Sequence, residues 1–237
     1  MSALFPVLVR SLATRGRLLA MGALGLIAVL LAVVVRVRSD ATFNRPDVAY
    51  NLVDSYGLSV LVPIVALVFA SAALGDPAED GTLVYLWLRP VPRWQLALAA
   101  SAAALTISVP LAVLPVVIGA AISGVGVRLV LGALAGALLA AAGYTAVFCG
   151  LGLRVRRALA WGLAYLLIWE QAVARLVKGA ARLSISVTTR TVVARIDRHQ
   201  PLPRNAMSMG VAVLVPLVAI ALAVAVTSRS LDRGEVT

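Results

Sequence analysis

The stretch GDPAEDGTLVYLWLRPVPRWQLAL, residues 75–98, separates two long apolar runs of the chain. It opens with acidic residues. Asp76 before Pro77 predicts the start of a short helix, because Asp is a common N-cap and proline fits the first helical position. It closes on RPVPR, residues 89–93, whose prolines end a helix. The pattern indicates a small rigid helix held at one membrane face between two spans.

The composition of the whole chain is that of an integral membrane protein. Of its 237 residues, 62% are hydrophobic and 13% are charged, which leaves too little polar surface to cover a soluble domain. The net charge is +11. Its arginines cluster at the ends of apolar runs, where they meet lipid headgroups, so we expect no nucleic-acid partner. One histidine and one cysteine are too few for a dedicated transition-metal site, and none is expected.

Six apolar segments reach or approach the roughly 20 residues that a helix needs to cross a bilayer. Their continuous apolar runs lack the alternation of barrel strands and favour helices. We therefore predict an all-α polytopic membrane protein with six transmembrane helices in a single transmembrane domain, residues 1–237. The predicted spans are residues 18–35, 56–74, 95–123, 127–153, 158–174 and 208–227.

Three segments outside the spans carry further predictions. Residues 2–14 place apolar side chains on one face and Arg10 on another, which predicts a helix lying in the membrane interface; a partly ordered basic tail is the alternative. Residues 75–94 form the loop between the second and third spans. Residues 175–207 interleave apolar residues with arginines, which fits short amphipathic helices on the headgroups or a solvated basic loop.

The distribution of basic residues does not decide the orientation. With the N-terminus inside the cell, the inside segments hold ten Lys or Arg residues and the outside segments hold eleven. Seven of those eleven lie between Arg175 and Arg204. Short clusters tight against span ends, such as residues 154–157, favour the N-terminus inside, whereas the 175–204 segment argues against it.

The loop sequence EDGTLVYLWLRPVPR, residues 79–93, resembles the E-x-G-T-L…L…P-[VS]-[SP]-R signature of permeases of the type II export class of ABC transporters. In that family the segment is a cytoplasmic coupling helix that docks on the ATPase subunit. Pro77 stands where many members have a second acidic residue, so that role is not carried over. The resemblance assigns ATPase coupling to Glu79, Gly81, Thr82, Leu83, Arg89, Pro90 and Arg93.

The resemblance extends along the chain. YLLIWEQAV, residues 165–173, is similar to a fifth-span stretch of many actinobacterial members. The family pattern implies a multi-pass protein of the inner (plasma) membrane with cytoplasmic termini, and it places residues 175–204 outside. It also implies a second permease copy, identical or a sister chain.

The chain itself lacks a phosphate-binding loop of the form G-x-x-x-x-G-K-[ST]. Lys178 is the only lysine, and no glycine-rich turn precedes it. We therefore expect a separate ATPase chain to bind ATP and Mg, and we expect no cofactor here.

Glu170 is the only acidic residue inside a predicted span, and Trp169 lies beside it. A carboxylate within the bilayer is costly and usually functional or paired. We interpret the two residues as part of the translocation path or its gate. Alternatively, Glu170 binds the basic external segment through an arginine, or the fifth span is short and Glu170 sits at the outer interface.

Gly132 and Gly136 form a small-x-x-x-small face that continues to Ala140 and Tyr144. Such a face permits close helix packing. Packing within the chain is the favoured interpretation over a dimer seam.

The expected function is the permease subunit of an ATP-driven exporter that moves an amphiphilic or hydrophobic substrate (drug, lipid or peptide) outward and is not itself an enzyme. One alternative is a membrane-embedded lipid-modifying enzyme, for which Asp40, Asp47 and Asp54 are weak candidate metal ligands. The other is a non-transporting immunity or signalling subunit.

Overall fold

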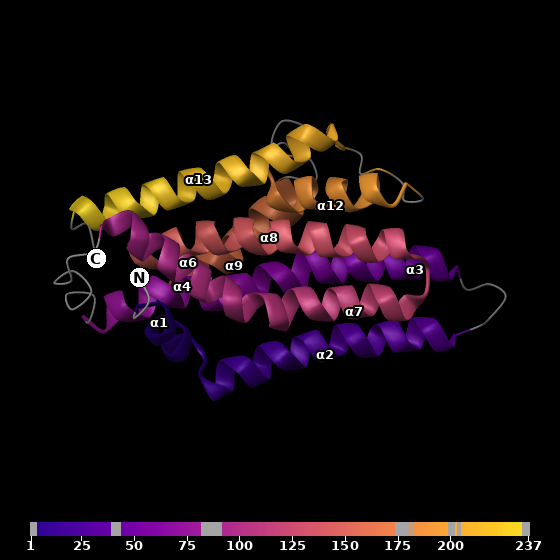
Figure 1. Ribbon diagram of the computed structural model, residues 1–237, viewed down its shortest axis with the longest axis horizontal. Helices are drawn as coiled ribbons and strands as arrows, with labels where there is room; N and C mark the ends of the chain where they lie inside the picture. Colours follow the sequence, from indigo (N-terminus) through magenta and orange to yellow (C-terminus); the bar gives the residue numbers. More distant parts are fainter. Residues whose placement is uncertain are drawn as a thin grey trace.

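The computed structural model describes residues 4–38, 44–81, 92–173, 181, 183–198, 202 and 205–233. Figure 1 shows these residues as a bundle of long helices that lie roughly parallel, with both chain termini at one end. Three segments, labelled η, are π-helical. The elements are α1 Leu4–Leu12, α2 Arg15–Val37, α3 Arg45–Asn51, η1 Leu52–Leu61, α4 Val62–Glu79, α6 Arg93–Ser108, η2 Val109–Val113, α7 Leu114–Ser123, α8 Val127–Arg154, α9 Ala158–Ala164, η3 Tyr165–Val173, α12 Ile185–Ile196 and α13 Met209–Arg233.

Five helical segments are long and apolar enough to cross a membrane. They are Arg15–Val37, Arg45–Glu79, Arg93–Ser123, Val127–Arg154 and Met209–Leu231. The segment predicted as the fifth span is shorter: α9 and η3 run from Ala158 to Val173, about 24 Å at 1.5 Å per residue. The hydrocarbon core of a bilayer is about 30 Å thick, so the described part of this segment is shorter than a full crossing, and residues 174–180 lie outside the described residues.

The π-helical segments of the second and third spans lie beside prolines. Pro63 lies two residues after the end of η1, Pro110 lies within η2, and Pro115 lies two residues after the end of η2. Proline has no N–H to donate, and its ring displaces the carbonyl four residues earlier, so a wider local helix relieves the clash. Both helices thus continue through their prolines.

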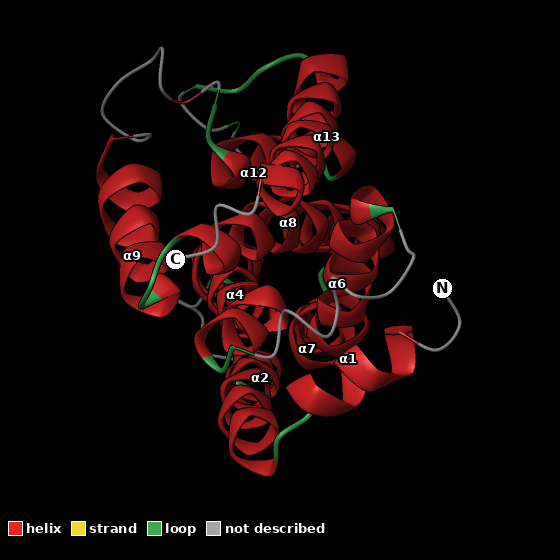
Figure 2. Cartoon of the chain, turned by 90° about the vertical axis from the view of Figure 1, so that its left-hand side faces the viewer, coloured by secondary structure: helices red, strands yellow, loops and turns green. Residues whose placement is uncertain are grey.

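Two helices, α4 and α8, make the centre of the bundle and pack closely along their length. In the most apolar part of Arg45–Glu79, 83% of the residues are buried, against 22% for α2 and 11% for α13. Seen end-on in Figure 2, α4 and α8 lie between the more peripheral α2, α9 and α13. The peripheral helices expose Leu26, Leu30 and Leu222, among others, which requires lipid around them.

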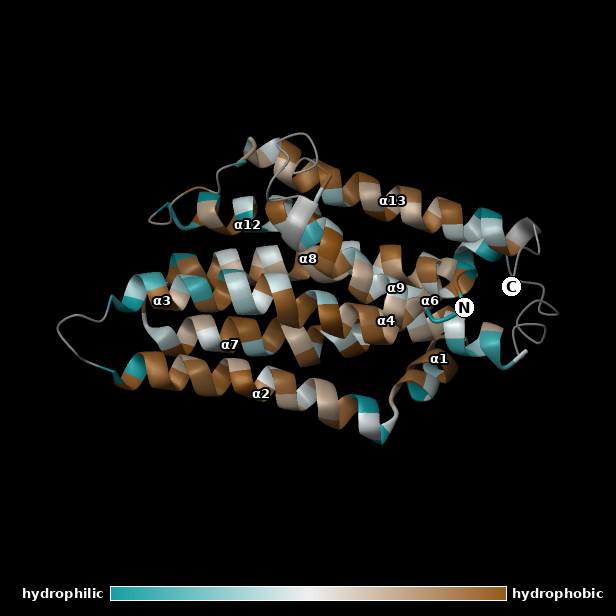
Figure 3. Cartoon of the chain, turned by 180° about the vertical axis from the view of Figure 1, so that it is seen from behind, coloured by the Kyte–Doolittle hydropathy of each residue, from teal (hydrophilic) through white to brown (hydrophobic). Residues whose placement is uncertain are grey.

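The bundle has two polar ends and an apolar middle (Figure 3). We name the end that carries both termini the terminus face; it holds the start of α2, the ends of α4 and α8, and the end of α13. The opposite face holds the end of α2, the start of α3 and the α7–α8 turn at Gly124. Gly124 has φ of 68°, a left-handed helix end that glycine adopts without a Cβ penalty.

The second span is longer at both ends than its apolar run. The helix begins at Arg45 and reaches Glu79, so the expected helix start at Asp76 is wrong. Asp76 instead lies in the last turns of α4, and its carbonyl accepts the backbone N–H of Asp80 at 2.9 Å. Tertiary packing extends the helix here, because Gly75 lies against the Gly152 backbone of α8.

The two segments predicted to lie at the membrane surface form helices that pack on the bundle. The α1 helix buries Leu8 and Leu12 and packs against α6 and α4. The α12 helix runs alongside α8 and α13 (Figure 1), and nine of its twelve residues are buried. A helix lying flat on the headgroups, as predicted for this part of residues 175–207, is therefore not what forms. The glycines of α8 and the threonines of α12 allow the closer fit.

Candidate coupling face and buried carboxylate

An ion pair at the terminus face joins the first span to the second. The Arg17 guanidinium, in the first turn of α2, donates to both carboxylate oxygens of Asp76 near the end of α4, at 2.8 and 3.3 Å. The side chains are 30% and 46% exposed, so the pair adds only modestly to stability and is weakened by salt. Its effect is mainly geometric, because it fixes α2 beside the segment that leads into residues 82–91.

Glu79, the last residue of α4, reaches the loop between α8 and α9. One oxygen of its carboxylate accepts the backbone N–H of Arg157 at 3.4 Å. Arg157 has φ of 61°, an uncommon left-handed conformation for a non-glycine residue. Gly81 follows with φ of 68°, and no atom lies within 4 Å of the point where a Cβ would stand, so backbone conformation, not space, favours glycine there.

The seven residues assigned to ATPase coupling fall on both sides of a gap in the described chain. Glu79 ends α4, Gly81 follows it, and Arg93 begins α6. Thr82, Leu83, Arg89 and Pro90 lie outside the described residues. Because α4 and α6 pack together, the two ends of the intervening loop are held side by side at the terminus face.

Glu170 lies near the end of η3 and is 2% exposed. Its carboxylate accepts four hydrogen bonds from the residues that the structure describes. The donors are the Tyr165 hydroxyl at 3.1 Å, the Ser184 hydroxyl at 2.5 Å, and the backbone N–H groups of Ile185 at 3.2 Å and Ser186 at 3.3 Å. This donor set suits a negatively charged group, because a helix N-terminus carries partial positive charge.

Ser184 completes the arrangement as the N-cap of α12. Its hydroxyl oxygen accepts the backbone N–H of Val187 at 3.1 Å while the hydroxyl donates to Glu170. Glu170 and Ser184 together bind free N–H groups of the first turn, which otherwise lack partners within the helix. Among the described residues, Glu170 thus binds the segment after it through hydroxyl and amide donors. Arg175 lies outside the described residues, so the expected contact with an arginine stays a prediction.

A second attachment of α12 joins it to the second span. The Arg190 guanidinium, midway along α12, donates through two nitrogens to both carboxylate oxygens of Asp54 in η1. Both side chains are about four-fifths buried. The sequence prediction that Glu170 is the only acidic residue within a span is therefore wrong, because the helix begins at Arg45 and includes Asp54.

The glycine face of α8 receives α12. A Cβ on Gly136 would lie 2.6 Å from the Val193 side chain and 3.2 Å from the Thr189 carbonyl, and one on Gly132 would lie 3.2 Å from the Val193 carbonyl. The favoured interpretation of this face, packing within one chain, is confirmed. Small residues let the two backbones approach closely.

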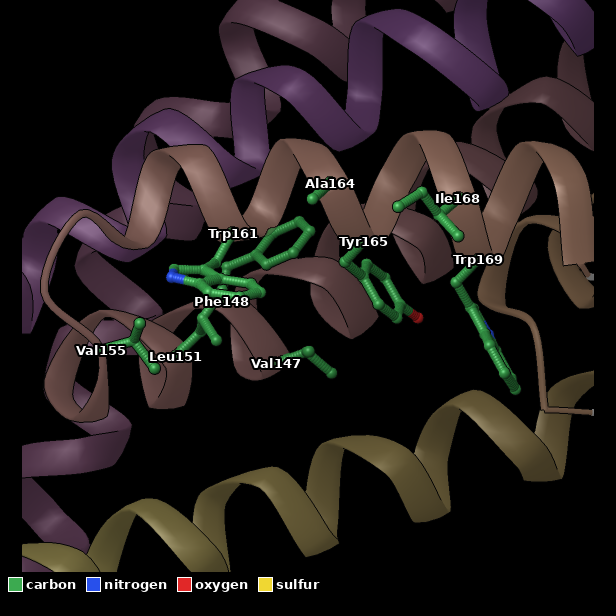
Figure 4. Close-up of a pocket in the computed structure, with 9 residues that line it drawn as sticks. All are labelled: Val147, Phe148, Leu151, Val155, Trp161, Ala164, Tyr165, Ile168 and Trp169. Carbon is green, nitrogen blue, oxygen red and sulfur yellow. The ribbon is translucent and has the colours of Figure 1, made fainter.

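Trp169 lines an apolar cavity of about 650 Å³ between α8 and the α9–η3 segment. Figure 4 shows Tyr165 and Trp169 projecting from η3 into the same space that Val147 and Leu151 enter from α8. The rings of Phe148 and Tyr165 meet edge to face across it, with centroids 6.1 Å apart. Trp169 and Glu170 are neighbours in sequence but face different surroundings: a crevice and the N-terminus of α12.

A family model described as ABC-2 family transporter protein matches residues 14–155, more than half of the chain. The chain belongs to the ABC-2 transporter family. It is a multi-pass membrane permease of an ABC transport system. A comparison with curated proteins found no match.

The ABC-2 match runs from the start of α2 to the end of α8 and includes the loop between α4 and α6. Arg17, Asp76 and Glu79 lie within it, and Glu170 and α12 lie beyond it. The contacts of Glu170 and Arg190 are therefore features of this chain that the family match does not describe.

The three aspartates weighed as metal ligands do not form a cluster where the structure describes them. Asp54 binds Arg190, and Asp47 accepts a hydrogen bond from Asn44 at 2.6 Å. Asp40 lies outside the described residues. Within the described ranges no three His, Cys, Asp or Glu side chains gather as metal ligands.

Proposed function

We propose that this ABC-2 chain is the transmembrane subunit of an ATP-driven exporter, paired with a separate ATPase chain and with a second permease copy. The observation that carries the proposal is the family match across α2–α8, which includes the loop that resembles a coupling helix. In this arrangement the terminus face is cytoplasmic in the inner (plasma) membrane, and α9–η3 is the fifth of six spans, completed by α12. The ATPase binds ATP and Mg, and this chain performs no chemistry of its own.

The coupling residues Glu79 to Arg93 transmit movement of the ATPase into the bundle. Three contacts support this route. Asp76 holds Arg17 of α2, Glu79 holds the Arg157 backbone at the start of α9, and α4 packs along α8. A displacement of the loop therefore acts on the first, second, fourth and fifth helices at once.

The substrate path is proposed to lie against apolar side chains, which suits an amphiphilic or hydrophobic molecule. In this proposal Glu170 keeps the gate closed, because its carboxylate binds the backbone N–H groups at the N-terminus of α12, toward the outer side. Trp169, which faces the adjacent crevice, lies where a passing hydrophobic group would contact it.

The first test is co-purification of the tagged chain from its host in mild detergent. We expect a stoichiometric partner with nucleotide-binding motifs. With that complex in nanodiscs, Glu79→Ala and Gly81→Ala should reduce substrate-stimulated ATP hydrolysis, whereas Gly81→Asn should largely retain it. Asparagine tolerates the left-handed conformation that alanine disfavours.

Arg128→Gln is the matched control, because Arg128 is exposed at the opposite face, in the first turn of α8. It should leave coupling unchanged. A chain that purifies without an ATPase, or a Glu79→Ala complex that hydrolyses ATP like the parent, would overturn the coupling assignment. The lipid-modifying and signalling interpretations would then lead.

A further inference from the structure

A forked crevice opens on the outside of α8 and reaches the terminus face at one end. Its two arms share Val147 and Leu151 of α8 and Val155, the residue that directly follows α8. One arm, about 650 Å³, extends toward α9 and η3. The other, about 370 Å³, extends toward α13. The two arms thus lie on either side of one ridge of α8 side chains.

The walls of the crevice are aliphatic and aromatic. Trp161 and Ile168 on one bank are 62% and 63% exposed, and Leu222 on the other bank is 61% exposed. These residues belong to helices in the apolar middle of the bundle (Figure 3), where lipid chains are the solvent. Water has too few hydrogen-bond partners there to fill such a space stably, whereas an acyl chain matches both its shape and its chemistry.

The end of the crevice at the terminus face is basic. Arg154 is part of its lining, and its Nε donates to the Ser230 hydroxyl of α13 at 2.6 Å. Arg156 and Arg157 follow and are exposed. On α13 the lining residues Ala219, Leu222, Ala223 and Val226 form one helical stripe, and exposed Arg229 is the next position along it.

We propose that the crevice binds one anionic phospholipid, with an acyl chain in each arm and its phosphate among Arg154, Arg156, Arg157 and Arg229. Charge complementarity selects the anionic headgroup, because basic pockets between spans at a membrane face bind such lipids. The fork of two apolar arms below one basic rim matches a headgroup that carries two chains. The crevice includes Trp169, which the proposed function assigns to the substrate path, but the binding test requires neither the ATPase nor a transported substrate.

The test uses the full chain in which Trp87 and Trp94 are replaced by Phe, so that Trp161 and Trp169 report on the crevice. Brominated phosphatidylglycerol or brominated phosphatidylcholine is titrated into the detergent-purified protein, and tryptophan quenching is measured. We expect phosphatidylglycerol to quench at concentrations at least about tenfold lower, given the strength of basic residues near a membrane surface.

The first set of variants tests the headgroup site and combines Arg156→Gln, Arg157→Asn and Arg229→Gln. Asparagine keeps the left-handed backbone of residue 157 accessible, and Arg154 is left in place for its contact with Ser230. The preference for phosphatidylglycerol should be lost. The matched control removes three exposed charges elsewhere, through Arg10→Gln, Arg15→Gln and Arg128→Gln, and should keep the preference.

The second variant tests the acyl-chain site. Ala219→Phe places a large side chain in the crevice and should weaken quenching by both lipids. Ala221→Phe is its control, because Ala221 is exposed and lies about 160° from the lining stripe of α13. Equal quenching by the two lipids in the parent protein, or a preference that survives the three arginine changes, would overturn the proposal.

A second copy of this chain is the other occupant that the test addresses. A Leu222→Cys variant in a Cys149→Ala background carries one cysteine at the crevice. Efficient disulfide cross-linking between copies at this position would show that protein covers the crevice and would also overturn the lipid assignment. The lipid assignment is supported if the Leu222→Cys variant forms no disulfide between copies and if the triple arginine variant loses its preference for phosphatidylglycerol.

Discussion

Among single residues, Glu170 links two segments that are separate in the sequence. Its carboxylate is bonded to Tyr165 within η3 and to three donors at the start of α12. A buried donor that loses its acceptor costs about 1–3 kcal/mol, so the arrangement is stable only as a complete set. The side chain therefore acts first as a structural fastener, and any role in gating acts through it.

We predict that Glu170→Ala lowers the thermal unfolding midpoint in detergent well below that of the parent. It leaves the Ser184 hydroxyl and the N–H groups of Ile185 and Ser186 without their acceptor. The unfolding midpoint of Glu170→Gln should lie between those of the parent and Glu170→Ala. The amide oxygen of glutamine still accepts hydrogen bonds, but its NH₂ group faces other donors. The control is Asp80→Ala, a change at an exposed acidic residue, which should unfold at the same midpoint as the parent. If Glu170→Ala also unfolded at the parent's midpoint, the four hydrogen bonds would not contribute to stability.

The sequence singled out Glu170 because a carboxylate in an apolar run is conspicuous, but it did not reveal the partners. Ser184 lies 14 residues farther along, in a segment predicted to form either short amphipathic helices on the headgroups or a solvated loop. Its hydroxyl meets Glu170 only because the chain folds back on the bundle. The sequence thus marked Glu170 as a candidate site residue, but it decided neither the burial of the side chain nor the identity of its donors.

Among the elements, α12 depends most on polar contacts with other helices. It packs its small and β-branched side chains on the glycines of α8 and pairs Arg190 with Asp54 of η1. Removing one partner of a largely buried ion pair is more damaging than removing both, because a charge is left without compensation.

A double-mutant cycle on Asp54→Asn and Arg190→Gln tests this attachment. Each single change should destabilise the protein by about 1–3 kcal/mol, and the double change should cost less than the sum of the two. Unfolding by denaturing detergent, followed by circular dichroism, measures the free energies. Strict additivity of the two changes would contradict a direct pair.

The elements that the sequence predicted well are those whose apolar runs alone account for them. The helices at Arg15–Val37, Val127–Arg154 and Met209–Arg233 follow the predicted spans closely. The second helix begins eleven residues before its predicted start because α3 and η1 are partly polar yet pack on the bundle. The placement of α12 escaped prediction, since it depends on glycines of a distant helix.

In the whole molecule, the seam between α4 and α8 is the tightest backbone contact that the glycines reveal. A Cβ added to Gly152 would lie 2.2 Å from the Ser71 carbonyl oxygen of α4, and one on Gly75 would lie 3.1 Å from the Gly152 carbonyl. Backbone atoms cannot rotate away as a side chain can. The centre of the bundle is therefore intolerant of even one added methyl group.

Gly152→Ala should consequently destabilise the protein by about 1–3 kcal/mol or more, because it forces the two central helices apart. Gly22→Ala is the control, because a Cβ at this position has space around it: the Leu111 side chain approaches it only to 3.9 Å. Alanine gains up to about 1 kcal/mol over glycine within a helix, so this variant should be neutral or stabilised. The thermal unfolding midpoints of both variants test this prediction. Equal midpoints would contradict the close backbone contact between α4 and α8.

The pairing of Asp54 with Arg190 also has a consequence for biosynthesis. Arg190 follows Asp54 by 136 residues, so at about 5–20 residues per second the ribosome delivers it roughly 7–27 seconds later. During that interval the newly made second span carries a carboxylate whose counter-charge has not yet been translated. The ion pair that attaches α12 to the second span can therefore form only late in synthesis, after most of the other helices have been made.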